Sequence, residues 1–244
     1  MSTPATQRAA GESPSASIGD FDHHADTYRE DVAKAIAWSG RDVDYFAEGK
    51  AELLVSLAAR RLGDPSGLRA LDVGCGIGVT DRFLVGRFAE LHGIDLAADA
   101  IEQARAANPT VDYRPYEGGH MPFEDDAVDV AFTICVLHHV PPAEWAAFAR
   151  EMRRVVRPGG LVVVFEHNPL NPLTRVSVSR CPFDEDVTLL RADATERLLC
   201  EVGLREPERR FFFFLPLRKI AESRLEHALR RVPLGAQYYV AATA

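Results

Sequence analysis

The chain has 244 residues, of which 47% are hydrophobic and 26% charged, and its formal net charge is -8. A chain of about this length can fold as one α/β domain around a sheet buried on both faces. The acidic charge argues against broad binding to nucleic-acid phosphates, and no stretch approaches the roughly 20 apolar residues of a membrane span. The four cysteines are far apart and match no zinc-binding spacing, which favours free thiols and a reducing compartment. We therefore expect a soluble, cytoplasmic protein without nucleic-acid binding or stable membrane insertion.

The N-terminal part of the chain divides into two regions. Residues 1–19 are rich in Ser, Ala, Pro and Thr and lack the charged and apolar segments of a signal peptide, which predicts a disordered leader. Residues 20–63 look helical, with Leu54, Leu57 and Ala58 in an apolar stripe and a stop signal at Gly63. We expect residues 20–244 to form one domain that begins with this helical cap.

A regular alternation of strands and helices follows. Apolar runs predict strands at residues 68–73, 91–94, 111–114, 128–136 and 161–165, and helical periodicity covers residues 81–88, 98–107 and 143–156. Residues 166–190 then form an insertion without clear periodicity, of the kind that often serves function. A helix is expected at residues 195–202, strands at 211–214 and 237–242, and an amphipathic helix at 218–232. This alternation predicts βαβ units and a parallel sheet.

A glycine turn follows the first predicted strand, in the segment Leu71-Asp72-Val73-Gly74-Cys75-Gly76-Ile77-Gly78. Glycines at such a junction let backbone amides approach a ligand closely. The spacing is G-x-G-x-G, so the third glycine falls one residue earlier than in the turn that admits a dinucleotide pyrophosphate. Together with the acidic Asp72 before the first glycine, this spacing favours a different ligand.

An acidic residue also ends the second predicted strand. Asp95 lies 23 residues after Asp72, where a carboxylate can accept hydrogen bonds from both hydroxyls of a ribose. The alternative is a carboxylate that caps the helix predicted at residues 98–107. Taken with the glycine turn, the ribose role is favoured.

The glycine turn resembles motif I of the class I S-adenosylmethionine-dependent methyltransferases, in their small-molecule, type 11/25-like group. Residues 120–123 with Asp129 resemble the family's L-P-F…F-D block, although Val128 replaces its usual Phe; residues 136–140 resemble its V-L-H-H segment, and residues 157–160 its R-P-G-G turn. The resemblance covers residues 21–165 well and the remainder more loosely. It implies a Rossmann-like, doubly wound, mostly parallel seven-stranded sheet with an antiparallel last strand.

The resemblance further implies S-adenosylmethionine as cofactor and S-adenosylhomocysteine as product. Gly74, Gly76 and Gly78, with Cys75 between them, would surround the methionine and ribose parts. Asp72 would orient this loop and the ammonium group, and Asp95 would bind the ribose.

The remaining cofactor contacts are expected from five other residues. Leu96 would lie against the adenine, Glu117 would accept a hydrogen bond from the adenine amino group in place of the usual Asp, and Gly118 would supply a backbone amide. Cys135 would line the path to the sulfonium. Tyr28 resembles an aromatic residue that closes over the methionine, with simple packing as the alternative.

Methyl transfer is an in-line displacement at a carbon already activated by the sulfonium, so alignment is the first requirement. An oxygen acceptor usually also needs a base or a metal, and histidine suits the former because it titrates near neutrality. The candidate bases are His23, His24, His138, His139, Glu166 and His167. For His138 and His139 a structural hydrogen bond is the alternative, and for residues 166–168 a polar cap on the following turn.

The insertion supplies the candidate substrate contacts. Asn168 follows the fifth strand, where sites of open α/β sheets lie, and Arg175 and Arg180 could grip a substrate carboxylate or phosphate. Surface arginines paired with nearby acidic residues are the alternative. We find no metal-binding motif and predict no metal.

These features together predict an enzyme that methylates an oxygen or nitrogen of a small molecule, such as a specialised metabolite, a sugar or a lipid-linked intermediate. The chain would act as a monomer or homodimer. The alternatives are the same fold used for non-methyl chemistry, an RNA or protein methyltransferase, and a nicotinamide-dependent oxidoreductase. The glycine spacing argues against the last, and the acidic charge against an RNA substrate.

Overall fold

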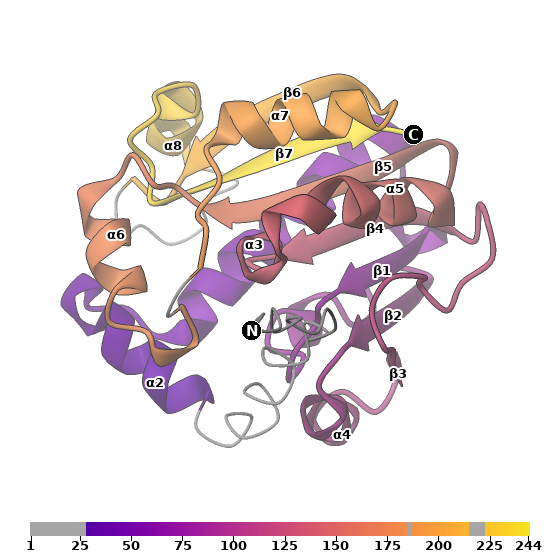
Figure 1. Ribbon diagram of the computed structural model, residues 1–244, viewed down its shortest axis with the longest axis horizontal. Coiled ribbons are helices and arrows are strands. Elements are labelled where there is room, and N and C mark those ends of the chain that lie inside the picture. Colours follow the sequence, from indigo (N-terminus) through magenta and orange to yellow (C-terminus); the bar gives the residue numbers. More distant parts are fainter. Residues whose placement is uncertain (1–27, 185–186, 215–222) are drawn as a thin grey trace, which may run out of the picture.

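The computed structural model describes residues 28–184, 187–214 and 223–244 (Figure 1). The predicted leader, His23 and His24 lie outside these residues. The described strands form a seven-stranded sheet in the order β3-β2-β1-β4-β5-β7-β6. They are β1 (Arg69–Val73), β2 (Glu90–Asp95), β3 (Asp112–Pro115), β4 (Val128–Ile134), β5 (Val156–His167), β6 (Arg205–Phe212) and β7 (Gln237–Thr243).

The pairing directions agree with the expected topology. The first five strands pair in parallel, whereas β7 lies between β5 and β6 and runs antiparallel to both. The prediction of a Rossmann-like, mostly parallel sheet with an antiparallel last strand is confirmed.

Helices cover both faces of the sheet. Figure 1 shows α5 (Trp145–Val155) and α7 (Ala192–Glu201) in front of it and α3 (Val43–Leu62) behind, and α4 (Ala98–Ala107) packs on the same core as α3. Successive residues of β5 point to opposite faces, so Val163 packs with the α3 side and Val164 with the α5 and α7 side. Burial on both faces explains the continuous apolar run of this strand.

The N-terminal region is helical as expected, with α2 (Tyr28–Ile36) and the 3₁₀ helix η1 (Ala37–Ser39) before α3. The side chain of Asp42 caps α3 by accepting a hydrogen bond from the backbone N–H of Tyr45 at 2.8 Å. The helix ends at Gly63, whose N–H donates to the carbonyl of Ala59. Its apolar stripe packs on the sheet.

The prediction of a helix at residues 81–88 was wrong. Only the 3₁₀ helix η3 (Asp81–Phe83) forms there, and turns follow it. Gly86 has φ +72°, a left-handed conformation that cannot continue a right-handed helix. Leu84 and Phe88 are nevertheless buried, so the apolar pattern indicated burial correctly and helix incorrectly.

The insertion at residues 166–190 contains a helix that its polar sequence did not reveal. Helix α6 (Pro172–Val178) begins after Asn171, whose side chain accepts hydrogen bonds from the N–H groups of Leu173 and Thr174. Proline at the first helical position is compatible with this start. The 3₁₀ helix η6 (Pro182–Asp184) follows.

The last elements differ in length from their predictions. Strand β6 ends at Phe212 because Phe213 adopts φ +59°, so the predicted strand at 211–214 starts too late and ends too late. Helix α8 (Arg224–Leu229) is shorter than the predicted helix at 218–232, part of which lies outside the described residues. Among the helices described, none is both long enough and apolar enough to cross a membrane.

Candidate functional site

The glycine turn lies at the carboxyl end of β1, and β2 holds it in place. The N–H groups of Gly74 and Cys75 both donate to the carbonyl of Ile94, at 2.8 and 3.1 Å. Gly74 has φ +80°, and a Cβ there would lie 2.5 Å from a methyl carbon of Val136. Gly74 therefore allows close packing against the end of β4.

The other two glycines of the turn differ from each other. Gly76 has φ +52°, and a Cβ there would meet no atom within 4 Å, so this residue faces open space. At Gly78 a Cβ would lie 2.6 Å from both Asn108 Nδ2 and Tyr113 Oη. Gly76 thus faces the cavity described below, whereas Gly78 packs on the underside of the turn.

The carboxylate of Asp95 fastens the turn from the side of β2. Its Oδ2 accepts from the N–H of Gly76 at 2.7 Å, and its Oδ1 accepts from the N–H of Ala97 at 2.9 Å. A carboxylate oxygen can accept more than one hydrogen bond. Asp95 therefore holds the turn and the residue before α4 without capping that helix, whose N-cap is Ala97 with no side-chain cap, and it retains capacity for a ligand.

Two buried carboxyl groups lie behind the turn. Asp72 and Asp81 are 3% and 0% exposed, and Asp81 accepts a hydrogen bond from Tyr113 Oη at 2.7 Å. Burial, together with the negative charge of Asp81, raises the pKa of Asp72 well above its usual value, and burial raises the pKa of Asp81 to about 6. Lys50, a buried residue of α3, opposes the shift of Asp72. These two acids therefore retain a proton at pH values where ordinary carboxyl groups are ionised.

These groups border a cavity of about 1440 Å³. The glycine turn, the carboxyl ends of β2, β4 and β5, and helices α2, α3 and α6 line it. Ligands of open α/β sheets bind at this edge, outside the carboxyl ends of the strands.

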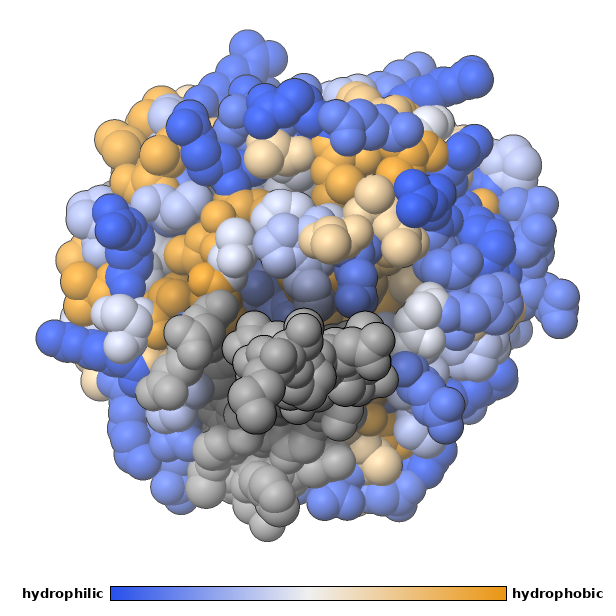
Figure 2. All heavy atoms as spheres, in the orientation of Figure 1, coloured by the Kyte–Doolittle hydropathy of each residue, from blue (hydrophilic) through white to orange (hydrophobic). Residues whose placement is uncertain are grey.

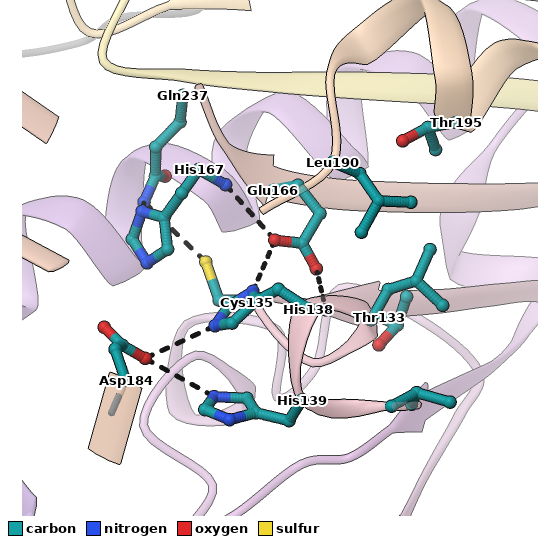
Figure 3. Close-up of polar contacts among 12 residues, drawn as sticks. Thr133, Cys135, His138, His139, Glu166, His167, Asp184, Leu190, Thr195 and Gln237 are labelled. Carbon is teal, nitrogen blue, oxygen red and sulfur yellow. Dashed lines mark hydrogen bonds and ion pairs between the residues drawn. The ribbon is translucent and has the colours of Figure 1, made fainter. Parts of the chain in front are cut away.

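Three histidines lie at one end of the cavity, with two carboxylates among them (Figure 3). His138 of the 3₁₀ helix η4 (Leu137–His139) lies between the acids: its Nδ1 is 2.6 Å from Glu166 Oε2, and its Nε2 is 3.3 Å from Asp184 Oδ1. Burial opposes a charge on the ring, but the two carboxylates outweigh it and raise the pKa of His138 well above 6.5. His138 is therefore an imidazolium near neutral pH.

The two neighbouring histidines have the opposite protonation state. Burial, reinforced by the charge on His138, lowers the pKa of both His139 and His167 to about 4. Asp184 Oδ1 lies 3.5 Å from His139 Nε2, and the amide Nε2 of Gln237 lies 3.4 Å from His167 Nδ1. The cavity thus contains neutral imidazoles beside a fixed positive charge.

Comparison with known proteins shows which sequences and folds this chain resembles. Residues 71–164 match a family model described as methyltransferase domain. The chain is 33% identical over 108 residues to 2-methyl-6-phytyl-1,4-hydroquinone methyltransferase of Synechocystis sp., covering 43% of this chain and 33% of that protein. It is 27% identical over 164 residues to a ubiquinone biosynthesis O-methyltransferase of Rhizobium leguminosarum bv. trifolii, covering 62% and 64% of the two chains.

Over residues 71–164 this chain is therefore similar to the methyltransferase domain, and its fold is that of solved S-adenosylmethionine-dependent methyltransferases.

The fold agrees with this assignment. A possible histamine N-methyltransferase from Thermotoga maritima matches with a TM-score of 0.65 at 16% identity, covering 93% of this chain and 99% of that one. At this identity the match concerns the fold alone. The alignments span about a third to just under two thirds of the length of the two curated relatives.

The methyltransferase domain offers groups that fit S-adenosylmethionine, the methyl donor of this family. Asp72 Oδ1 is buried and lacks a hydrogen-bond partner within the described part of the chain, and the ligand's ammonium group is a donor. Asp95 can accept from ribose hydroxyls, and Gly76 leaves open space for the ligand to approach. Lys50 lines the same cavity and would bind the ligand's carboxylate.

Most of the residues expected to contact the cofactor line this cavity. They are Asp72, Gly74, Cys75, Gly76, Asp95, Leu96, Glu117, Gly118 and Cys135. Gly78 is absent from the lining, consistent with its packing role. Helix α2 begins at Tyr28, but the side chain of this residue lies outside the described part of the structure.

The predicted catalytic residues fall into two groups. His138, His139 and His167 line the cavity, whereas Glu166 is 0% exposed, is absent from the lining and contacts His138 and the backbone N–H of His167. The predicted substrate contacts lie elsewhere: Arg175 and Arg180 are exposed outside the cavity lining. The Asn168 amide donates to the carbonyls of Pro233 and Gly235, which is a structural role.

Three of the cavity residues that were not predicted as site residues bear on its chemistry. Lys50 occupies a position on the buried face of α3, and a lysine among apolar residues was a usable signal. Asp184 and Gln237 reach the histidines from 46 and 70 residues away along the chain, so local patterns could not reveal them. The backbone of Cys135 is left-handed at φ +57°, which places this residue close to Gln237.

One set of side chains has the composition of a metal site. Ligand atoms of His138, His167 and Asp184 lie within 4.8 Å of one another. However, both ring nitrogens of His138 are engaged by carboxylates that favour its protonated form, and a metal ligand must be deprotonated. The arrangement therefore favours proton transfer over metal binding at these residues. That the protein uses no metal stays a prediction.

Proposed function

We propose that this chain transfers a methyl group from S-adenosylmethionine to a hydroxyl oxygen of a small, largely apolar molecule, such as a phenol or hydroquinone with a lipid tail. The observation that carries the proposal is the group of neutral and charged histidines facing the cavity beside Cys135. A hydroxyl acceptor needs such proton handling, because the free hydroxyl is a weak nucleophile.

The dimensions of the cavity support a second ligand. Typical small-molecule pockets measure about 300–1,000 Å³, and this cavity reaches about 1440 Å³. Apolar side chains of α2 and α6, among them Ile36, Leu173 and Val178, line the part contributed by these helices. The named relatives act in hydroquinone and ubiquinone chemistry, which agrees with an acceptor of this class.

We place the acceptor hydroxyl beside His138, His167 and Asp184, whose side-chain nitrogen and oxygen atoms lie within 4.8 Å of one another. The neutral imidazole of His167 accepts the proton. The imidazolium of His138 stabilises the negative charge that develops on the oxygen, and Glu166 and Asp184 hold it in that state. Bound S-adenosylmethionine supplies the electrophilic methyl group.

The proposal is tested with isotopically labelled cofactor and a panel of hydroquinones, phenols, sugars and amines, with product masses and methylated positions determined. His167→Asn should lower kcat about 100-fold and leave cofactor affinity measured by calorimetry within about threefold. His92→Asn, at a histidine of β2 outside this cavity, is the matched control and should retain kcat. Methylation of nitrogen or carbon, or full activity of His167→Asn, would contradict the proposal.

A further inference from the structure

Large apolar side chains are exposed on one edge of the molecule. Of nine such side chains among the described residues, all but Val85 and Leu96 belong to three segments: η1, α6 with the residue pair before it, and α8 with the loop that leads to β7. They are Trp38, Leu170, Leu173, Val176, Leu225, Val232 and Leu234, each between 36% and 59% exposed. Figure 2 shows apolar surface gathered at the left edge, where Figure 1 places α6.

Hydrogen bonds hold these three segments together. Trp38 Nε1 donates to Ser177 Oγ at 2.7 Å, which joins η1 to α6. Asn171 Nδ2 donates to the carbonyl of Leu234 at 2.7 Å, which joins α6 to the loop before β7. These bonds bring η1, α6 and the loop before β7 side by side, and we call the edge that carries the seven apolar side chains the rim.

Helix α6 has two distinct sides. Thr174 and Val178 are buried against the molecule, whereas Leu173 and Val176, three residues apart, are exposed together. Trp38 and Leu173 also line the cavity. The rim thus borders an entrance to the cavity.

The same edge carries positive charge. Arg175, Arg180, Arg224 and Arg231 are exposed, and the ion pairs found within the described residues include none of them. The acidic residues described in residues 170–184 and 223–235 are Asp184 and Glu226, and both turn inward. A chain with net charge -8 therefore has a basic edge here.

We propose that this docking rim, formed by the seven apolar side chains and four arginines named above, binds the surface of a membrane that contains anionic lipids. Apolar side chains of this kind insert into the boundary between headgroups and acyl chains, while arginines bind lipid phosphates. An amphiphilic molecule can then pass from the bilayer into the cavity past Trp38 and Leu173. The docking itself does not require the proposed methyl transfer.

Other partners fit this edge less well. A nucleic acid would make no use of seven exposed apolar side chains, and the net charge of the chain repels it. A second copy in a two-fold dimer would place the same four arginines on both sides of the contact. The combination of apolar and basic residues favours the bilayer.

Flotation of the full chain with vesicles tests the proposal. We expect binding to phosphatidylcholine vesicles that contain about 30% phosphatidylglycerol to exceed binding to pure phosphatidylcholine at least about tenfold, and to weaken in 0.5 M salt. The double variant Arg175→Glu/Arg180→Glu should lower the partition coefficient about tenfold or more. Leu170→Ser/Val176→Ser should lower it several-fold, and this loss should persist in high salt.

The control is Val85→Ser/Arg87→Glu, which changes an exposed apolar residue and an exposed arginine outside the rim. It should bind vesicles as the unchanged chain does. Circular dichroism and calorimetry with S-adenosylhomocysteine separate loss of docking from loss of fold. Lack of vesicle binding by the unchanged chain, equal losses in rim and control variants, or a dimer or RNA complex that the rim variants abolish would overturn the proposal.

Discussion

The protonation states of individual side chains carry the proposed chemistry, and they predict a pH profile. The pKa of His167 is lowered to about 4, so this residue is a neutral base over most of the usable range. The pKa of His138 is raised well above 6.5 by Glu166 and Asp184, so its charge is lost only in alkaline solution. Activity should rise through about pH 4, stay level across neutrality and fall at alkaline pH.

This profile is measured as kcat/KM against pH under steady-state conditions with an identified acceptor. Glu166→Gln should move the alkaline limb to lower pH, because His138 loses one of the carboxylates that hold its proton. An unchanged alkaline limb in this variant would show that His138 is not the group that titrates there.

The buried pair Asp72 and Asp81 predicts how stability depends on pH. The pKa of Asp81 is raised to about 6 in the folded chain, above its unfolded value. The folded state therefore binds this proton more tightly, and stability decreases as pH rises from the unfolded value through about 6. Asp81→Asn removes this cost and should raise stability at pH 8 by roughly 1–2 kcal/mol, with a smaller gain at pH 5.

Urea denaturation at the two pH values measures this difference. The amide oxygen of the asparagine can still accept from Tyr113 Oη, as Asp81 does now. Asp112→Asn, at an exposed carboxylate with a lowered pKa, is the control and should not stabilise at pH 8. If Asp81→Asn changed the free energy of unfolding equally at both pH values, the raised pKa of Asp81 in the folded chain would be contradicted.

At the level of elements, the positions of the glycine turn differ in why they require glycine. Gly74→Ala combines a left-handed backbone with a contact of 2.5 Å to Val136 and should cost about 2–4 kcal/mol of stability. Gly76→Ala meets open space and should cost only about 1–2 kcal/mol for its backbone. Its methyl group would instead enter the cavity and lower cofactor affinity at least about tenfold.

Thermal unfolding and calorimetry on the two variants separate these effects. Gly40→Ala, another left-handed glycine with open space around it, is the control for backbone cost without a cofactor contact. If Gly76→Ala bound the cofactor as tightly as the Gly40→Ala control, the cofactor would not approach the turn at this residue.

An element could be predicted from the sequence where residues close together in the chain determine its structure. The helix at residues 98–107 was predicted at its observed bounds, and the glycine turn was located from its spacing. Helix α6 was missed because its start depends on the Asn171 cap and Pro172, and not on apolar periodicity. The helix at 81–88 was predicted falsely because apolar spacing cannot distinguish a buried turn from a buried helix.

The same distinction holds for the site. Asp72, Gly76 and Asp95 were predicted because the spacing of a short segment determines their positions, and they line the cavity as expected. The contacts of His138 with Glu166 and Asp184 span 28 and 46 residues. Such contacts depend on how β4, β5 and the insertion meet in space, which a single sequence does not specify.

At the level of the whole molecule, the sheet predicts a gradient of local stability. β5 is paired on both sides, by β4 and β7, and most of its residues are buried. Helix α6 lies at the edge of the molecule with several exposed residues. Backbone amides in the centre of β5 should exchange with deuterium at least about 100-fold more slowly than those of α6.

Hydrogen exchange followed by mass spectrometry measures this gradient. Saturating S-adenosylhomocysteine should slow exchange at residues 72–78 and 95–97, which surround the predicted cofactor position. Protection confined to other parts of the chain would place the ligand elsewhere. Uniform exchange in β5 and α6 would contradict the expected order of stability.

The position of β7 has a consequence for synthesis of the protein. This strand leaves the ribosome after both β5 and β6, yet it occupies the sheet between them. Until it emerges, a nascent chain holds one side of β5 unpaired and leaves β6 without its partner. Such an open edge invites pairing with other chains, so the interval between the synthesis of β5 and the emergence of β7 is when this protein would most need a chaperone.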